Sequence, residues 1–178
     1  MHYELGDYAL DIAQNAVEAG SREVLVELDE SAGGFRVTVS DDGRGMTADE
    51  RTRALDPFYT DGTKHARRKV GLGLPFLVQA AELAGGDWSI ESEKGAGTKV
   101  DFGFPAASVD SPPAGDIPSL VLCLLCLPGD HEMIVRRSSP RGSYELRRSE
   151  LSEAVGGLER ASGLALLKDY LASMEYDE

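Results

Sequence analysis

The chain has 178 residues, 42% hydrophobic side chains, a formal net charge of −13 and two cysteines. Its length and apolar fraction fit one folded domain, or one domain with an appendage, and exclude a disordered chain. The negative charge argues against nucleic acid and anionic membranes as partners, and two cysteines cannot form a disulfide framework, so we expect a cytoplasmic protein.

The first part of the chain predicts a helix, a strand hairpin and a short helix. Apolar residues recur at three- and four-residue steps over residues 5–19, which is typical of an amphipathic helix. Alternating residues predict strands at 23–28 and 35–40, joined by the hairpin loop DESAGG. Thr47 and Glu50 form a capping-box pair that begins a short helix to about Leu55.

The next part predicts a helix and a second hairpin. After an irregular basic stretch, a helix carries Pro75 in its first turn and ends at Gly85-Gly86. Strands at 87–93 and 98–104 flank the turn KGAG. Helices between hairpins indicate an α+β fold with two layers, in which helices cover one face of a mostly antiparallel sheet.

The last part predicts a small C-terminal α+β annex. Residues 108–116 are a linker by composition. An apolar helix to about Leu127, two short strands at 131–137 and 143–148, and one or two helices follow. We therefore expect a main domain at 1–107 and the annex at 117–178, where a partner protein would dock. The apolar run at 120–127 is far shorter than the ~20 residues that span a bilayer.

Polar residues on the first helix are the first candidates for chemistry. Asp11, Asn15 and Glu18 are spaced i, i+4 and i+7, so they share a face beside the apolar stripe. An Asn oxygen is a suitable ligand for Mg²⁺, and a carboxylate one turn earlier can hold a water or hydroxyl beside a phosphate. The alternative is a polar helix flank in solvent.

Three glycine-containing turns are further candidates. In DDGRGM, Asp41 ends a strand, and Gly43 and Gly45 allow close backbone approach, although ordinary turns use the same residues. In KVGLGL, Gly71 and Gly73 lead into a helix, where backbone N–H groups attract phosphate. The alternative interpretation of the basic run beside this turn is an ordinary solvated loop. The third turn, GAGTKV, is a hairpin turn whose threonine can point a hydroxyl at a base.

In this order the motifs resemble a known superfamily. DIAQNAVEAG, DDGRGM, DPFYTDG, KVGLGL and GAGT look like the N, G1, F, G2 and G3 boxes of the GHKL ATPases, which include gyrase-type topoisomerases, Hsp90, histidine kinases and MutL. The resemblance covers residues 5–104. DPFYTDG and GLGL are most similar to histidine kinases, and QNAVEAG is similar to MutL and anti-sigma-factor kinases. It implies the Bergerat fold and a pocket for ATP and Mg²⁺.

The resemblance also implies a role for each matching residue. Asn15 would hold Mg²⁺, Asp41 would bind the adenine amine, and Thr98 would support that contact through water. Residues 59–70 would form the ATP lid. The expected ATP-binding residues are Asn15, Asp41, Gly43, Gly45, Met46, Phe58, Lys64, Lys69, Gly71, Leu72, Gly73, Leu74 and Thr98.

Two departures from the family pattern bear on chemistry. Lys69 and Val70 replace the glycine-rich start of the G2 box, so Lys69 is expected to contact phosphate. Asp11 stands where hydrolytic members have Glu, one methylene longer, and is the candidate catalytic base. Ten residues precede Asp11, too few for a hairpin with a phosphoacceptor histidine. We therefore expect a stand-alone module.

Two functions fit these expectations. One is an ATPase or kinase that acts on an unidentified partner protein, and the other is a nucleotide sensor without turnover that signals through the order of its lid. Oligomerisation is compatible with both. Cys123 and Cys126 are expected to face the core of an apolar helix rather than form a redox or metal site.

Overall fold

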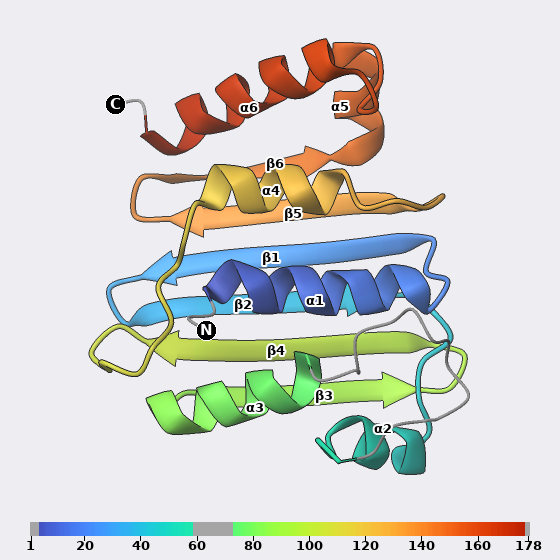
Figure 1. Cartoon of the computed structure of the whole chain (residues 1–178), viewed down its shortest axis with the longest axis vertical. Coiled ribbons are helices and arrows are strands. Elements are labelled where there is room, and N and C mark those ends of the chain that lie inside the picture. Colours follow the sequence, from blue (N-terminus) through green and yellow to red (C-terminus); the bar gives the residue numbers. More distant parts are fainter. Residues whose placement is uncertain (1–3, 59–72, 177–178) are drawn as a thin grey trace.

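The computed structural model describes residues 4–58 and 73–176. Within these ranges, six strands form one mixed sheet in the order β3-β4-β2-β1-β5-β6, and α1, α3 and α4 lie across one of its faces (Figure 1). The strands are β1 (Glu23–Ser31), β2 (Gly34–Asp41), β3 (Asp87–Glu93), β4 (Gly97–Pro105), β5 (Glu132–Ser139) and β6 (Gly142–Arg147). The helices are α1 (Leu5–Glu18), α2 (Ala48–Ala54), α3 (Gly73–Ala84), α4 (Ile117–Leu125), α5 (Arg148–Val155) and α6 (Ala161–Tyr176). The α+β, two-layer fold class is confirmed.

The strand pairing joins the C-terminal region to the rest of the sheet. The pairs β1–β2, β2–β4, β3–β4 and β5–β6 are antiparallel. Strand β5 instead runs parallel to β1, with Glu23 opposite Glu132 and Asp29 opposite Ser138. The segment expected as an annex therefore contributes two strands to the same sheet.

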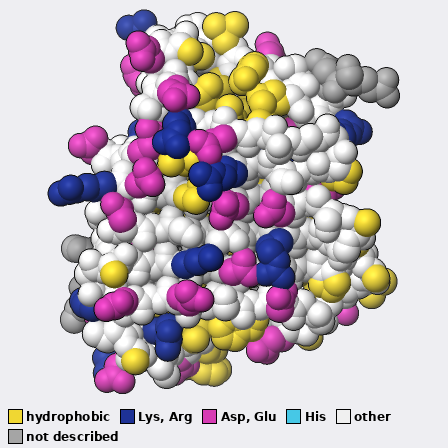
Figure 2. Space-filling view, turned by 180° about the vertical axis from the view of Figure 1, so that it is seen from behind, with side chains coloured by type: hydrophobic (Ala, Val, Ile, Leu, Met, Phe, Trp, Pro, Cys, Tyr) yellow, Lys and Arg dark blue, Asp and Glu magenta, His cyan; other side chains and the backbone are white. Residues whose placement is uncertain are grey.

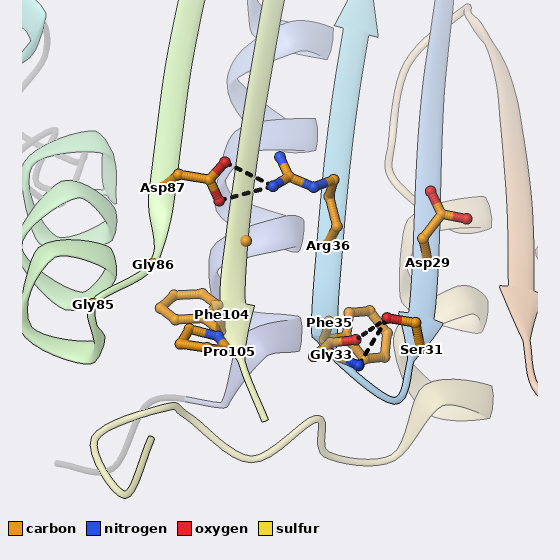
Figure 3. Close-up of a pocket in the computed structure, with 12 residues that line it drawn as sticks. Asp29, Ser31, Gly33, Phe35, Arg36, Gly85, Gly86, Asp87, Phe104 and Pro105 are labelled. Carbon is orange, nitrogen blue, oxygen red and sulfur yellow. Dashed lines mark hydrogen bonds and ion pairs between the residues drawn. The ribbon is translucent and has the colours of Figure 1, made fainter. Parts of the chain in front are cut away.

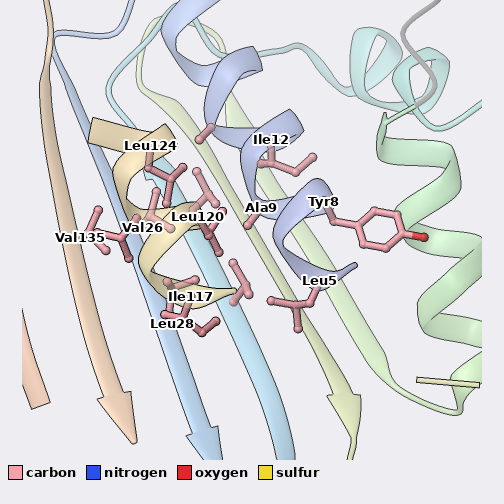
Figure 4. Packing of buried hydrophobic residues seen from close by; sticks show 14 of the residues in the cluster. Leu5, Tyr8, Ala9, Ile12, Val26, Leu28, Ile117, Leu120, Leu124 and Val135 are labelled. Atoms are coloured by element: carbon pink, nitrogen blue, oxygen red, sulfur yellow. The ribbon is translucent and has the colours of Figure 1, made fainter. Parts of the chain in front are cut away.

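The core lies between the sheet and its helices. Figure 4 shows α1 and α4 side by side, with Leu5, Ile12 and Leu120 directed at the strands. Val26 and Leu28 meet them from β1, and both are fully buried. Each such side chain contributes about 1.5–3 kcal/mol by leaving water. The amphipathic helix predicted at residues 5–19 is therefore present as α1, and its apolar face packs on the sheet.

Local signals define several element ends. The Thr47 hydroxyl accepts a hydrogen bond from the Glu50 N–H, and the Glu50 carboxylate accepts one from the Thr47 N–H, so the predicted capping box begins α2. Gly85, with φ of 70°, follows the last residue of α3. These ends place the loops that flank the sheet.

The other face of the sheet is charged. Figure 2 shows acidic and basic side chains across this face, which helices leave open. Arg136 lies between carboxylates of neighbouring strands, 2.7 Å from Glu145 and 3.5 Å from Glu27. Such exposed pairs are worth little individually. They keep this face in solvent while the opposite face forms the core.

A buried ion-pair network holds the end of α6. The Arg137 side chain is 2% exposed and pairs with Glu30 and with Glu175, the latter at 3.1 Å. Its guanidinium also lies 5.2 Å from the centre of the Phe35 ring. Tyr144 donates a hydrogen bond of 2.8 Å to the Glu175 carboxylate. Because Glu175 belongs to α6 while Arg137 and Tyr144 belong to β5 and β6, this network ties α6 to the edge of the sheet.

The prediction for the cysteines is wrong in one respect. Cys123 is exposed and Cys126 is half-buried, and both are free thiols. The inner face of α4 is instead formed by Ile117, Leu120, Val121, Leu124 and Leu125. Among the residues that the structure describes, none of the helices combines the length and hydropathy that a bilayer crossing needs.

Candidate functional site

Several predicted motifs meet at one end of the sheet. In Figure 1 this is the end where α1 finishes, β2 leads toward α2, and the β3–β4 turn lies. The antiparallel register puts Asp41 of β2 directly opposite Thr98 of β4. The backbone N–H of Arg44 donates to the Ala19 carbonyl just after α1, at 3.1 Å. The sheet therefore brings the DDGRGM loop to both the helix end and the GAGT turn.

Asp41 points to the helix side of the sheet. Side chains alternate along a strand, and Val37 and Val39 of the same parity are buried beneath the helices. Asp41 Oδ1 accepts hydrogen bonds from the Gly43 N–H at 2.7 Å and the Ser21 hydroxyl at 3.0 Å. The Ser21 hydroxyl also lies 2.6 Å from the Ala16 carbonyl, so its single proton is shared between α1 and β2.

Burial and hydrogen bonds act in opposite directions on the pKa of Asp41. The carboxyl is half-buried, and this desolvation raises its pKa above the ordinary value, against the lowering effect of the hydrogen bonds from Gly43 and Ser21. The adjacent Asp42 differs, because the backbone N–H groups of Glu23 and Arg22 lower its pKa. Asp42 therefore caps the start of β1, while Asp41 is a partly desolvated acceptor.

The glycines of this loop are required by close packing. A Cβ on Gly43 would lie 2.6 Å from Ser21 Oγ. Gly45 has φ of 58°, and a Cβ there would lie 1.9 Å from the Glu93 carbonyl oxygen. The next N–H, of Met46, donates to Ser92 Oγ at 2.8 Å. The bare backbone thus lets the loop pack against the β3–β4 turn.

Ser92 links this loop to Thr98. Its hydroxyl lies 2.8 Å from Thr98 Oγ1. Gly97 has φ of 106°, and a Cβ there would lie 1.9 Å from the Asp41 carbonyl oxygen. Ser21 and Ser92 were not predicted as site residues, since a single serine near a turn is an ordinary feature and their partners are distant in sequence. The packing of α1 against β2 identifies Ser21, and the register of β3 and β4 identifies Ser92.

A second cluster joins α1 to the start of α3. A Cβ on Gly73 would lie 3.3 Å from both Cβ and Oδ2 of Asp11. The Asp11 side chain therefore lies against the first residue of α3, where N–H groups and the helix dipole favour anions. Asn15 follows one turn later on the same side of α1, toward Asp41, and is exposed. The helix spacing thus places Asn15 between the two clusters.

The remaining predicted residues fall into two groups. Leu74 is partly buried and packs against the core, whereas Phe58 is 92% exposed at the end of a described range. Lys64, Lys69, Gly71 and Leu72 lie outside the described residues.

Two hollows on the surface lie at different ends of the sheet. One, of about 430 Å³, lies at the opposite end of the sheet (Figure 3). There Arg36 spans β4 to reach both carboxylate oxygens of Asp87, at 2.7 and 2.8 Å, and a Cβ on Gly103 would lie 2.9 Å from Asp87 Oδ1. This pair ties strands together and is remote from the motifs. The other hollow, of about 470 Å³, is lined by Arg22, Glu23, Leu25, Ser40, Asp41 and Asp42.

One family model matches more than half of the chain. The family model described as histidine kinase-, DNA gyrase B- and HSP90-like ATPase matches residues 4–108. The chain therefore belongs to this family, and its GHKL-type ATPase domain carries the DDGRGM and GAGT turns described above.

Curated relatives lie in two branches of the family. The chain is 36% identical over 101 residues to an uncharacterised sensor-like histidine kinase of Rhizobium meliloti, covering 54% of this chain and 19% of that protein. It is 33% identical over 117 residues to the sensor histidine kinase AruS of Pseudomonas aeruginosa, covering 61% and 12%. It is 39% identical over 83 residues to the mismatch repair protein MutL of Thermus aquaticus, covering 43% and 15%. The chain thus spans less than a fifth of each of these relatives.

Two solved structures of histidine kinases match part of the chain. The catalytic domain of ThkA matches with a TM-score of 0.43 and 21% identity, over 56% of this chain and 64% of that one. The mycobacterial sensor histidine kinase MprB matches with a TM-score of 0.42 and 24% identity, over 55% and 69%.

Proposed function

We propose that the chain binds ATP with Mg²⁺ at the end of the sheet where Asp41, Asn15 and Gly73 lie, and that it acts through a partner protein. The observation that carries this proposal is the half-buried Asp41 carboxylate, held by Ser21 and Gly43 beside bare backbone. Membership of the ATPase family supports the same site.

Asp41 is suited to bind the exocyclic amine of adenine. A carboxylate has about four acceptor sites, so one that already accepts from Gly43 and Ser21 can accept another hydrogen bond. Its orientation toward α1 leaves the base between the sheet and the helices. Thr98 and Ser92 present hydroxyls to the same region, where a water would join Thr98 to the base.

The polar side of α1 is suited to magnesium and phosphate. Mg²⁺ prefers oxygen ligands, keeps several waters and uses one or two protein ligands beside substrate phosphates. The described residues contain no group of three or more metal-ligating His, Cys, Asp or Glu side chains, which fits an ion held by Asn15 and by phosphate rather than by a protein cage. When bound, the ion neutralises phosphate charge, and the start of α3 offers N–H groups to the same anion.

Asp11 is the candidate base. A carboxylate beside the start of α3 can accept a proton from a water or an acceptor hydroxyl held in line with the terminal phosphate. The products are ADP with inorganic phosphate, or ADP with a phosphorylated partner. The chain itself aligns the nucleophile and receives the proton.

The test uses Asp11→Asn with Glu18→Gln as a charge-matched control on the same helix. We expect Asp11→Asn to abolish ATP turnover while the ATP dissociation constant stays within about threefold of wild type, because only proton transfer is removed. Glu18→Gln should retain both. Partners captured by an ATP-dependent pull-down from the native host serve as substrates in a phosphate-transfer assay.

The second candidate is a nucleotide sensor without turnover. It is favoured by the short Asp11 side chain, which packs against Gly73 where the hydrolytic members have the longer Glu. In that case Asp11→Asn changes neither turnover nor binding. If wild type binds ATP but neither hydrolyses it nor transfers its phosphate to any captured partner, the result supports the sensor.

A further inference from the structure

Cys123 and Cys126 form a thiol pair on the outer side of α4. Cys123 lies in the last turn of the helix, and Cys126 is its C-cap residue. Cys123 is exposed, whereas the leucines on both sides of Cys126, Leu125 and Leu127, are buried. The helix therefore directs its leucines at the core and leaves both thiols on its outer side.

This exposure is unusual for free cysteine. A free thiol behaves as a small hydrophobic group and is among the most buried side chains in proteins. Two of them, three residues apart, lie on the same side of a helix and are neighbours. Packing in the core does not explain such a pair.

Geometry favours metal binding over a disulfide. Helical neighbours three residues apart have Cβ atoms about 5–6 Å apart, whereas a disulfide needs about 3.5–4.5 Å. Two thiolates on one tetrahedral ion have sulfurs about 3.8 Å apart, given metal–sulfur bonds of about 2.3 Å. Cβ atoms about 5–6 Å apart are compatible with this shorter sulfur–sulfur distance, because each side chain can direct its sulfur toward the ion.

The pair supplies only half of a tetrahedral site. In the part of the chain that the structure describes, no cluster of three or more ligating side chains exists, so these thiols lack a third ligand there. Structural zinc sites almost always have four ligands, and two-fold symmetric pairing is the commonest way in which identical chains associate. We propose that Cys123 and Cys126 of two copies of this chain together bind one thiophilic divalent ion of the zinc class.

The charges are consistent with such a site. Binding four thiolates to one divalent ion forms four metal–sulfur bonds, releases four protons and changes no oxidation state. The resulting centre has a charge of −2. Arg148, whose Nη1 donates to the carbonyls of Gly129 and His131 at 2.9 Å, is held near Cys126 and offsets part of this charge. Because each chain carries −13, association should depend on the ion.

The test is a titration of the reduced full-length chain with Co²⁺, which reports thiolate ligands through charge-transfer absorption. We expect saturation at one ion per two chains. Zn²⁺ should displace Co²⁺ and convert the monomer into a dimer in sedimentation experiments. Chelation by EDTA should reverse this.

The matched control is the double variant Cys123→Ser, Cys126→Ser, whose ATP affinity should equal that of wild type because neither thiol belongs to the proposed ATP site. This variant should lose both the absorption and the dimer. The proposal is overturned if wild type shows no thiolate-to-cobalt absorption, if the double variant shows the same absorption, or if wild type saturates at one ion per chain and stays monomeric.

Discussion

The substitution Asp41→Asn removes one charge and almost no volume. In wild type, Asp41 Oδ1 accepts from Gly43 and Ser21, and the carboxylate has capacity for the adenine amine. If the asparagine oxygen still accepts from Gly43 and Ser21, its NH₂ group faces the adenine amine. Two hydrogen-bond donors then face each other, and the hydrogen bond to the base is lost. Losing a hydrogen bond to a charged group costs about 1.5–3 kcal/mol. We therefore expect the ATP dissociation constant to rise about 10- to 150-fold.

Calorimetry with ATP and Mg²⁺ measures this change directly. The matched control is Asp42→Asn, which removes an equal charge one residue away from a carboxylate that caps the N–H groups of Arg22 and Glu23. Its ATP affinity should stay within about threefold of wild type, since screening weakens a charge that does not touch the ligand. If Asp41→Asn folds like wild type and binds ATP with unchanged affinity, the adenine is not bound by this carboxylate.

Further predictions concern stability. Gly45→Ala should lower the free energy of unfolding by about 2–4 kcal/mol in urea titrations, because the new Cβ clashes with the Glu93 carbonyl. The control is Gly95→Ala, at a glycine with φ of 84° and open space around it, which should lose about 1 kcal/mol. Equal losses in the two variants would contradict the clash. Burial and the Glu175 carboxylate raise the pKa of Tyr144, so wild type should lose stability as the pH rises above about 10, where the unfolded tyrosine ionises. Tyr144→Phe should start less stable but lose less between about pH 8 and 11 in the same titrations, and parallel losses in both proteins would rule out this residue as the source.

Side-chain period predicted most of the fold. The helix at 5–19 and the strands at 23–28 and 87–93 correspond to α1, β1 and β3 because each turns its apolar side chains toward the core, and that face repeats at 3.6 or 2 residues. Pairing across long separations could not be predicted in this way. Strands β1 and β5 pair in parallel although about 110 residues separate them, and no local pattern identifies that neighbour.

The candidate site was predicted only where its residues stand in local motifs. Asp41, Gly43 and Gly45 are recognisable because one turn contains them all. Ser21 is not, since its contact with Asp41 arises from the packing of α1 against β2. The burial of Cys123 was mispredicted for a related reason: nearly every residue of α4 is apolar, so composition does not reveal which side faces the core.

We propose that Asp41 and Asn15 contact opposite ends of one magnesium-bound nucleotide. The most direct measurement is a crystal structure of the chain with Mg²⁺ and a non-hydrolysable ATP analogue. We predict the adenine amine within hydrogen-bond distance of the Asp41 carboxylate and the Asn15 amide oxygen on the ion. A nucleotide bound in the hollow beside Arg36 and Asp87, or an adenine amine turned away from Asp41, would contradict this placement of the nucleotide.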